Sequence, residues 1–289
     1  MINITNLHFG YKKRKIFNGL SLTLQAGHIY GLLGKNGTGK STLLKSIAGF
    51  LFPDKGTVEV MGFVPGKRQP AFLQDVFMVA EEFYLPDVSV QKYVKLNANF
   101  YPKFNHEQFG RYLNEFEIPL ENTLQSMSYG QKKKVLICFG LACNTALLLM
   151  DEPTNGLDII SKSKFRKVIA GAITDEKCIV ISTHQVKDLE SLIDRITIID
   201  EGQILFDQTI DNINRKIQFK ISFDNEEVRE ALYREPSLQG NAIVCANYEG
   251  EDTKPDLELL YKAVVTNGDA VRSVFNNKQA EHTKTNQSN

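Results

Sequence analysis

The chain contains no tryptophan, only four cysteines among its 289 residues, and no excess of charge of either sign. Lys+Arg and Asp+Glu each number 34, so no overall field attracts the protein to nucleic acid or anionic lipid. The cysteines form no CxxC pair and lack zinc-ligand spacing, and three of them lie in strongly apolar stretches. We therefore expect reduced, buried thiols in a cytosolic protein. The four are Cys138, Cys143, Cys178 and Cys245.

Long hydrophobic runs are also missing, and none of the apolar stretches approaches the length that spans a bilayer. The segment Met1–Asn6 alternates like a strand and lacks the basic and apolar regions of a signal peptide. Any membrane role is therefore expected to come through a partner. The hydrophobic content of 42% and charged content of 24% are typical of a soluble globular protein. This length accommodates one large domain, alone or with a small appendage.

A phosphate-binding P-loop fits the segment Gly34–Thr42, which reads GKNGTGKST. An apolar stretch typical of a buried strand, Ile29–Leu33, precedes it, and Leu43–Gly49 has the pattern of the first turns of a helix. The glycines let successive backbone N–H groups face a phosphate, and the helix adds its positive N-terminal end. The alternative is a glycine-rich turn with an incidental lysine, which does not require these flanks. The expected nucleotide-binding residues are Gly34, Asn36, Gly37, Thr38, Gly39, Lys40, Ser41 and Thr42.

A second motif, Leu147–Glu152, is an apolar strand that ends in two carboxylates and fits a Walker B motif. In such a site Lys40 reaches the β- and γ-phosphates and Ser41 ligates Mg²⁺. Asp151 then holds Mg²⁺, directly or through water, and Glu152 orients and polarises the attacking water. The alternative is a strand that merely ends in an acidic turn. Together the two motifs predict a nucleoside triphosphatase.

Strands and helices alternate along most of the chain, which predicts a largely parallel α/β sheet. Aromatic and aliphatic residues at helical spacing predict a mostly helical insert at about 83–140. Beyond about residue 208 the alternation ends, and 209–276 is expected to form a small α+β appendage. Residues 277–289 are rich in Asn, Lys and Gln and are expected to be disordered. Expected strands are Leu20–Leu24, Gly56–Val60, Val76–Val79, Ala146–Met150, Cys178–Ser182, Ile196–Ile199, Gln203–Phe206, Ile217–Phe223 and Ala242–Cys245. Expected helices are 162–173, Val186–Ile193, Glu226–Tyr233 and Leu257–Val265.

Three further segments indicate which class of nucleoside triphosphatase this is. Met127–Gln131 reads MSYGQ, Pro153–Asp158 reads PTNGLD, and Ser182–His184 reads STH. In this order they resemble the signature sequence, D-loop and switch histidine of ATP-binding cassette (ABC) proteins, over about residues 1–208. Tyr11 stands where that family places an aromatic residue that stacks on adenine. The resemblance implies the P-loop NTPase fold of an ABC ATPase, with an N-terminal antiparallel β part, and a domain at 1–208.

The resemblance also implies a mechanism. ATP and Mg²⁺ are the expected cofactors, and Ser128, Gly130, Gln131 and Asp158 join the nucleotide contacts. Two chains pair head to tail, with ATP held between Lys40 of one and Ser128 of the other. The partner is a second copy or a homologous ABC subunit. His184 contacts the γ-phosphate and helps to hold the water that Glu152 activates.

Three features of the sequence depart from the family pattern or invite another interpretation. Tyr129 replaces the first glycine of the signature, and Glu81 replaces the Q-loop glutamine. A glutamate can still ligate Mg²⁺, but it cannot donate a hydrogen bond when it is ionised. Hydrolysis or its coupling is therefore expected to differ from that of a glutamine enzyme. The run Lys132–Lys134 is interpreted as a solvated helix face rather than a nucleic-acid site, since no aromatic platform accompanies it.

Within the family, one cassette without a spanning segment resembles the ATPase subunit of a transporter whose permease is a separate polypeptide. The lead-in Tyr30–Gly34 and Glu81 resemble exporter-type subunits. We expect the protein at the cytoplasmic face of the cell membrane, held there by its permease, and no nucleic-acid partner. A permease groove is expected to include Phe83, Tyr84, Phe100 and Tyr101. The alternatives, soluble ABC ATPases acting on ribosomes or on DNA, usually carry two cassettes or long coiled coils.

Overall fold

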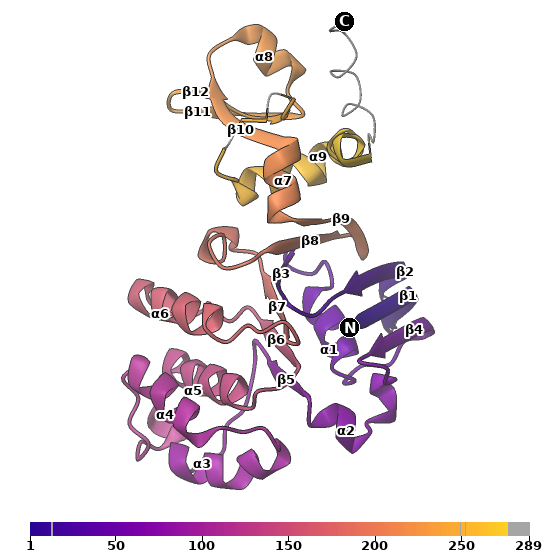
Figure 1. Ribbon diagram of the computed structural model, residues 1–289. Coiled ribbons are helices and arrows are strands. Elements are labelled where there is room, and N and C mark those ends of the chain that lie inside the picture. The colour runs from indigo at the N-terminus through magenta and orange to yellow at the C-terminus, as the bar shows by residue number, and fades with distance from the viewer. Residues whose placement is uncertain (13, 249, 252, 277–289) are drawn as a thin grey trace, which may run out of the picture. The chain divides into compact units, whose positions relative to one another are not determined.

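The computed structural model describes residues 1–12, 14–248, 250–251 and 253–276 (Figure 1). The chain divides into two compact units. Unit 1 comprises Met1–Arg195 and Ile199–Ile204, and unit 2 comprises Ile196–Ile198 and the chain from Leu205 onward. The expected domain limits, 1–208 and 209–276, remain predictions. The expected disordered tail at 277–289 lies outside the described residues.

Unit 1 contains a three-stranded antiparallel sheet with strand order β2-β1-β4. Apolar residues alternate with polar ones along β1, and Ile2, Ile4, Leu7 and Phe9 are buried in the core. This period of two places one face of the sheet against the core and the other toward solvent. The strands are β1 (Ile2–Tyr11), β2 (Arg14–Leu24) and β4 (Lys55–Val60).

The central sheet has the strand order β5-β6-β7-β3-β8-β9. The pairs β3–β7, β5–β6 and β6–β7 are parallel. All six residues of β7 and all five of β6 are buried, as expected of strands covered on both faces. Because parallel strands share one carboxyl edge, β3, β6 and β7 bring the P-loop, Asp151-Glu152 and His184 to the same edge. The strands are β3 (His28–Leu33), β5 (Val76–Val79), β6 (Leu147–Asp151), β7 (Cys178–Thr183), β8 (Arg195–Asp200) and β9 (Gln203–Thr209).

The predicted helical insert is confirmed. Helices α3, α4 and α5 form one group in unit 1, separate from the antiparallel sheet (Figure 1). Phe139 of α5 lies at its centre and contacts the rings of Phe77, Tyr93, Phe104 and Phe109. The helices of unit 1 are α1 (Lys40–Ile47), α2 (Pro70–Leu73), α3 (Val90–Asn97), α4 (His106–Glu115), α5 (Tyr129–Ala142) and α6 (Ile159–Ala170). Short 3₁₀ turns cover Pro65–Lys67, Ala98–Phe100, Leu124–Ser126 and Val186–Asp188.

The helix predicted at Val186–Ile193 is wrong. Only Val186–Asp188 form a 3₁₀ turn, and turns follow it. Leu189, Leu192 and Ile193 are nevertheless buried, and the Leu192 N–H donates to the Leu189 carbonyl three residues back. Over two turns, an apolar spacing of three or four residues does not distinguish a helix from 3₁₀ turns.

The α6 helix begins at Ile159 rather than at residue 162, because the side chain of Asp158 caps it.

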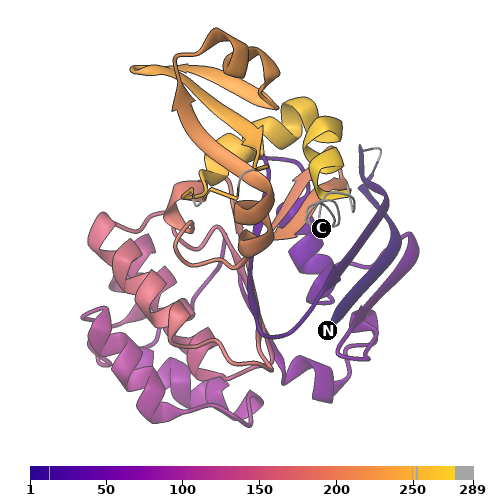
Figure 2. The ribbon, with the colours of Figure 1, turned by 45° about the horizontal axis from the view of Figure 1, so that its top comes forward.

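In unit 2, a three-stranded antiparallel sheet with order β10-β12-β11 packs against α9 (Figure 2). The predicted helix Glu226–Tyr233 ends early, because Tyr233 begins a strand that the sequence did not predict. That strand contains Pro236, which argues against a central strand but is tolerated at the edge that β11 occupies. The elements are α7 (Ile210–Lys216), β10 (Ile217–Ser222), α8 (Asn225–Glu230), β11 (Tyr233–Ser237), β12 (Gly240–Ala246) and α9 (Leu257–Asn276). Helix α9 extends eleven residues beyond the predicted end at Val265 and is interrupted at Asn267.

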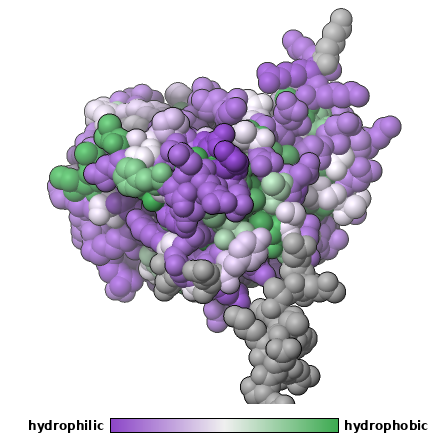
Figure 3. All heavy atoms as spheres, turned by 90° about the horizontal axis from the view of Figure 1, so that it is seen from above, coloured by the Kyte–Doolittle hydropathy of each residue, from purple (hydrophilic) through white to green (hydrophobic). Residues whose placement is uncertain are grey.

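All four cysteines are free, and Cys138, Cys143 and Cys178 are buried, which confirms the expectation of buried thiols. Cys245, on β12, is partly exposed. Burial raises the pKa of all four thiols. None of the described helices combines the length and hydropathy needed to cross a membrane. The face drawn in Figure 3 is mainly hydrophilic, with hydrophobic residues in separate groups.

Candidate functional site

The P-loop joins β3 to α1 and places Lys40 at the first position of that helix. Gly39 precedes it at φ 108°, in the left-handed region that favours glycine. A Cβ at this position would also lie 2.7 Å from the Phe17 ring, so any larger residue would push the loop off the antiparallel sheet. The Lys40 Nζ donates to the carbonyls of Gly34 (2.8 Å) and Lys35 (3.1 Å) and so closes the loop around its ammonium.

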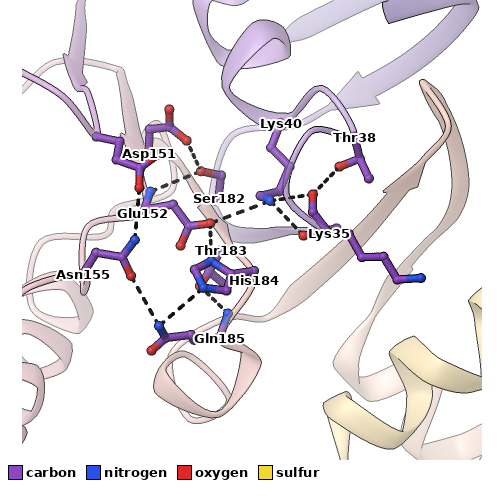
Figure 4. A network of polar contacts seen from close by, with 12 residues as sticks. Lys35, Thr38, Lys40, Asp151, Glu152, Asn155, Ser182, Thr183, His184 and Gln185 are labelled. Atoms are coloured by element: carbon purple, nitrogen blue, oxygen red, sulfur yellow. Dashed lines mark hydrogen bonds and ion pairs between the residues drawn. The ribbon is translucent and has the colours of Figure 1, made fainter.

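Two cationic or polar groups converge on the carboxylate of Glu152 (Figure 4). The His184 Nδ1 lies 2.8 Å from Glu152 Oε1, and the Lys40 Nζ lies 3.7 Å from the same oxygen. Glu152 is only 3% exposed, and its Oε2 is buried without a hydrogen-bond partner. Burial lowers the pKa of Lys40, and the carboxylates of Glu152 and Asp151 partly oppose that shift. One carboxylate oxygen is therefore held in place while the other remains available.

The neighbouring strand fixes the backbone of this acidic pair. The Ser182 Oγ donates to Asp151 Oδ1, and the Glu152 N–H donates to the Ser182 carbonyl at 3.1 Å. Glu152 has φ 46°, a left-handed conformation that non-glycine residues seldom adopt. The two carboxylates therefore diverge. Asp151 is directed toward β7, and Glu152 toward Lys40 and His184 (Figure 4).

A chain of side-chain amides connects Glu81 to the histidine. The Asn155 Nδ2 donates to Glu81 Oε1 at 3.1 Å, and the Gln185 Nε2 lies 3.5 Å from both the Asn155 Oδ1 and the His184 Nε2. Ser182 and Asn155 lie within motifs of the sequence but had no predicted role, and Gln185 was not predicted. Their positions next to Asp151-Glu152 and His184, at the ends of adjacent parallel strands, were the available signal.

The segment Met127–Gln131 forms the start of α5. Ser128 caps the helix and exchanges hydrogen bonds with Gln131 in a capping box. The Tyr129 hydroxyl donates to the Glu81 carbonyl, and its ring stacks on Phe83 at 5.3 Å between centroids. A Cβ on Gly130 would lie 2.5 Å from the Gly156 carbonyl oxygen, so this segment lies directly against the Pro153–Asp158 loop.

Comparison with known proteins agrees with this geometry. The ABC transporter family model matches residues 17–155. The ABC transporter ATP-binding protein NatA of Bacillus subtilis is 31% identical over 234 residues, which cover 74% of this chain and 91% of NatA. The Nod factor export ATP-binding protein I of Burkholderia lata is 31% identical over 220 residues, covering 70% of this chain and 68% of that protein. This chain belongs to the ABC transporter ATP-binding proteins.

A solved ATP-binding subunit of an ABC transporter has the same fold. Its TM-score is 0.67 at 24% identity, and the match covers 74% of this chain and 92% of that one. As a member of this family, the chain is an ATP-binding subunit of an ABC transporter and an ATPase. Its mixed α/β fold with a mostly parallel sheet is the expected ABC ATPase core.

Not all the predicted site residues of this ABC protein lie around Glu152. Asp158 caps α6, accepting hydrogen bonds from the Ser161 hydroxyl and N–H, and these hydrogen bonds lower the pKa of Asp158 to about 2. Tyr11 is 45% exposed at the end of β1 and packs edge-on against Phe9. Ser41 and Thr42 follow Lys40 in α1, and the loop residues Asn36 and Gly37 are exposed.

The interpretation of Lys132–Lys134 as a solvated helix face is wrong for its middle residue. Lys133 is fully buried, and its Nζ donates to the Glu152 carbonyl oxygen at 2.8 Å. The continuous apolar run that follows, Val135–Ala142, signalled that α5 is buried on all sides, so a lysine two residues before this run was a candidate for burial.

Proposed function

We propose that this ABC subunit hydrolyses ATP with Glu152 as the residue that orients and polarises the attacking water. The observation that carries this proposal is the buried Glu152 carboxylate, with one oxygen bonded to His184 and the other without a hydrogen-bond partner. A buried, unpartnered carboxylate oxygen is costly unless it has a ligand for part of the working cycle. His184 would keep the carboxylate oriented and contact the γ-phosphate.

The phosphates would be bound by the loop N–H groups and Lys40, with Asn36, Gly37, Thr38, Gly39, Ser41 and Thr42 contributing the remaining contacts. Before nucleotide arrives, Lys40 donates to loop carbonyls and faces Glu152. Its ammonium would exchange these partners for phosphate oxygens, and Glu152 would then lose a charge partner and become freer to accept a proton from water. Tyr11, exposed at the end of β1, would stack on the adenine.

The donors proposed for Mg²⁺ are Ser41, Asp151 and Glu81, a hydroxyl and two carboxylates. Such hard oxygen donors suit Mg²⁺, which also takes phosphate oxygens and waters. Among the described residues, no group of three His, Cys, Asp or Glu side chains could hold a metal by itself, so these donors would act together with the nucleotide. When bound, Mg²⁺ neutralises charge developing on the transferred phosphoryl group.

We further propose a head-to-tail pair in which Ser128, Gly130, Gln131 and Asp158 of one subunit complete the site of another. Ser128 and Gln131 are exposed at the N-terminus of α5, a helix of 14 residues, where N–H groups and the helix dipole favour an anion. The partner is a second copy or a homologous subunit.

The transport partner is proposed to be a separate membrane permease, which would contact the helical group of unit 1. Tyr84 is 83% exposed and Phe100 is 67% exposed, which suits a contact with another protein. Phe83 instead packs on the ring of Tyr129, and Tyr101 packs on the ring of Phe77. These two residues would therefore contribute to the predicted groove by supporting their neighbours. We propose export as the direction, since one relative is named as an export protein, and a position on the inner face of the cell membrane.

The Glu152→Gln variant tests the catalytic assignment. We expect it to bind ATP, to lose turnover, and to form an ATP-dependent dimer in light scattering after gel filtration. Glu59→Gln is the matched control, because Glu59 is an exposed acid on β4. A Glu152→Gln protein that hydrolyses ATP like the control would contradict the role of Glu152.

Recovery of the tagged Glu152→Gln protein from gently solubilised native membranes, with and without ATP, tests the transport assignment. We expect one integral membrane polypeptide in stoichiometric amount, and less of it with Tyr84→Asp or Phe100→Asp. Recovery of ribosomes or DNA instead would favour the soluble alternatives.

A further inference from the structure

Lys133 is a fully buried cation that none of the nucleotide contacts proposed above requires. It lies in the first turn and a half of α5, and burial lowers the pKa of its ammonium, while the carboxylates of Glu81, Asp151 and Glu152 act in the opposite direction. Lysine is seldom fully buried, because removing its charge from water is costly unless partners replace the lost hydration. The partners of Lys133 therefore indicate why its charge is kept.

The first partner is the backbone of Glu152. The Lys133 Nζ donates to the Glu152 carbonyl oxygen at 2.8 Å, and the Asn155 N–H donates to the same oxygen at 3.2 Å. Glu152 has φ 46°, a strained conformation for a non-glycine residue, so it persists only where the surroundings hold it. On the other side of the residue, its N–H is held by the Ser182 carbonyl. The peptide groups on both sides of Glu152 are therefore held by hydrogen bonds, which restricts the backbone that carries its side chain.

The second partner is the aromatic residue that replaces a glycine in the signature. The Lys133 Nζ lies 5.0 Å from the centroid of the Tyr129 ring, within the range of a cation–π contact. Tyr129 in turn donates its hydroxyl to the Glu81 carbonyl and stacks on Phe83. One ammonium group thus contacts both the signature segment and the Walker B segment.

We propose that Lys133 is a positioning residue, which holds the Glu152 backbone in its working conformation and ties it to Tyr129. The proposal rests on the role proposed above for Glu152. A movement of the signature segment, as when a second subunit approaches, would then be transmitted to the Glu152 carbonyl through one side chain. Tyr129 and Lys133 act as a pair: the ring that departs from the family pattern provides a surface for the cation.

Lys133→Met tests the proposal, because methionine keeps the length of the side chain and removes both the donor and the charge. We expect kcat for ATP to fall about ten- to hundredfold, the effect of losing one charge-assisted hydrogen bond. KM for ATP should stay within about twofold, and the thermal midpoint should stay the same or rise, since an apolar side chain costs less to bury. Lys132→Met is the matched control, on the adjacent and partly exposed lysine, and should behave like the wild type.

Two additional variants separate positioning from a structural role. Lys133→Arg keeps a donor and a charge and should restore part of kcat, whereas a folded Lys133→Arg as slow as Lys133→Met would overturn the proposal. Tyr129→Leu should lower kcat, and the double variant Tyr129→Leu/Lys133→Met should be no slower than Lys133→Met alone, within about threefold. Losses that multiply would overturn the coupling to Tyr129.

The decisive comparison is made alongside Glu152→Gln. Wild-type kcat in Lys133→Met, with Glu152→Gln inactive, would overturn this inference and leave the role of Glu152 intact. A Lys133→Met protein that loses turnover only together with ATP binding and thermal stability would also overturn it, since Lys133 would then act on the fold. Full activity in Glu152→Gln would instead remove the proposed function on which the inference rests.

Discussion

Gly130→Ala is expected to destabilise the protein, although alanine is a better helix former than glycine. Gly130 lies in the first turn of α5, and an added Cβ would lie 2.5 Å from the Gly156 carbonyl oxygen. Real Cβ atoms essentially never come closer than 3.0 Å, so the two segments must separate by at least 0.5 Å. The Gly156 backbone has φ 81° and lies against the Tyr129 ring, which limits how far Gly156 can move away from α5.

Two effects of opposite sign determine how much Gly130→Ala changes the free energy of unfolding. Overpacking of this kind costs about 1–3 kcal/mol, and the helix propensity of alanine returns at most about 1 kcal/mol. With the full propensity gain, the net loss of unfolding free energy is therefore up to about 2 kcal/mol. Each kcal/mol corresponds to about 2–4 °C in thermal midpoint for a domain of this size. Turnover should fall as well, because the displaced segment carries Tyr129.

Thermal unfolding, followed by circular dichroism or calorimetry, measures the loss against Gly110→Ala. Gly110 lies inside α4, where an added Cβ would meet nothing within 4 Å, so only helix propensity acts. That variant should gain up to about 1 kcal/mol. If Gly130→Ala were stabilised as much as Gly110→Ala, the close approach of the signature to the Pro153–Asp158 loop would be refuted.

Three other substitutions give separate tests of the site. Lys40→Ala should abolish ATP turnover by weakening phosphate binding, and normal turnover would refute the P-loop assignment. Tyr11→Ala should weaken ATP binding by about 1 kcal/mol, or about fivefold in Kd by titration calorimetry, and an unchanged Kd would mean that Tyr11 does not stack on adenine. Asp158→Asn tests the low pKa of that carboxyl. Because the folded pKa of about 2 is below the ordinary 3.8, the stabilisation by ionised Asp158 is fully present above about pH 4 and is lost as pH falls toward 2. The urea midpoints of wild type and Asp158→Asn should therefore differ by a constant amount from pH 7 to pH 5 and converge below pH 4, and a gap that widens on acidification would contradict the capping role.

The sequence predicted the parts of the fold that depend on local patterns. The P-loop, β6 with its two carboxylates and β7 before His184 are short contiguous signals, and each is an apolar run ending in polar groups. Their meeting at one edge follows from parallel pairing alone. The strand pairs around β6 and β7 confirm this arrangement.

The elements that the sequence misassigned depend on distant contacts. The residues next to Lys133 do not reveal that its ammonium donates to the Glu152 carbonyl, because Lys133 and Glu152 are 19 positions apart in the sequence. The strand at Tyr233–Ser237 exists because β12 offers it an edge, which overrides the proline within it. The 3₁₀ turn at Val186–Asp188 and the turns after it bury the apolar residues whose spacing suggested a helix, so hydrophobicity could not separate the two; these residues are Val186, Leu189, Leu192 and Ile193.

The unequal burial of the four thiols makes the native chain convenient for fluorescence. Cys138, Cys143 and Cys178 are buried and only Cys245 is partly exposed, so a maleimide would react preferentially with Cys245. A single dye would then mark unit 2 without the removal of any natural cysteine. A second dye on Glu59→Cys, in unit 1, would give energy transfer that measures the distance between the two units during each round of ATP binding and hydrolysis.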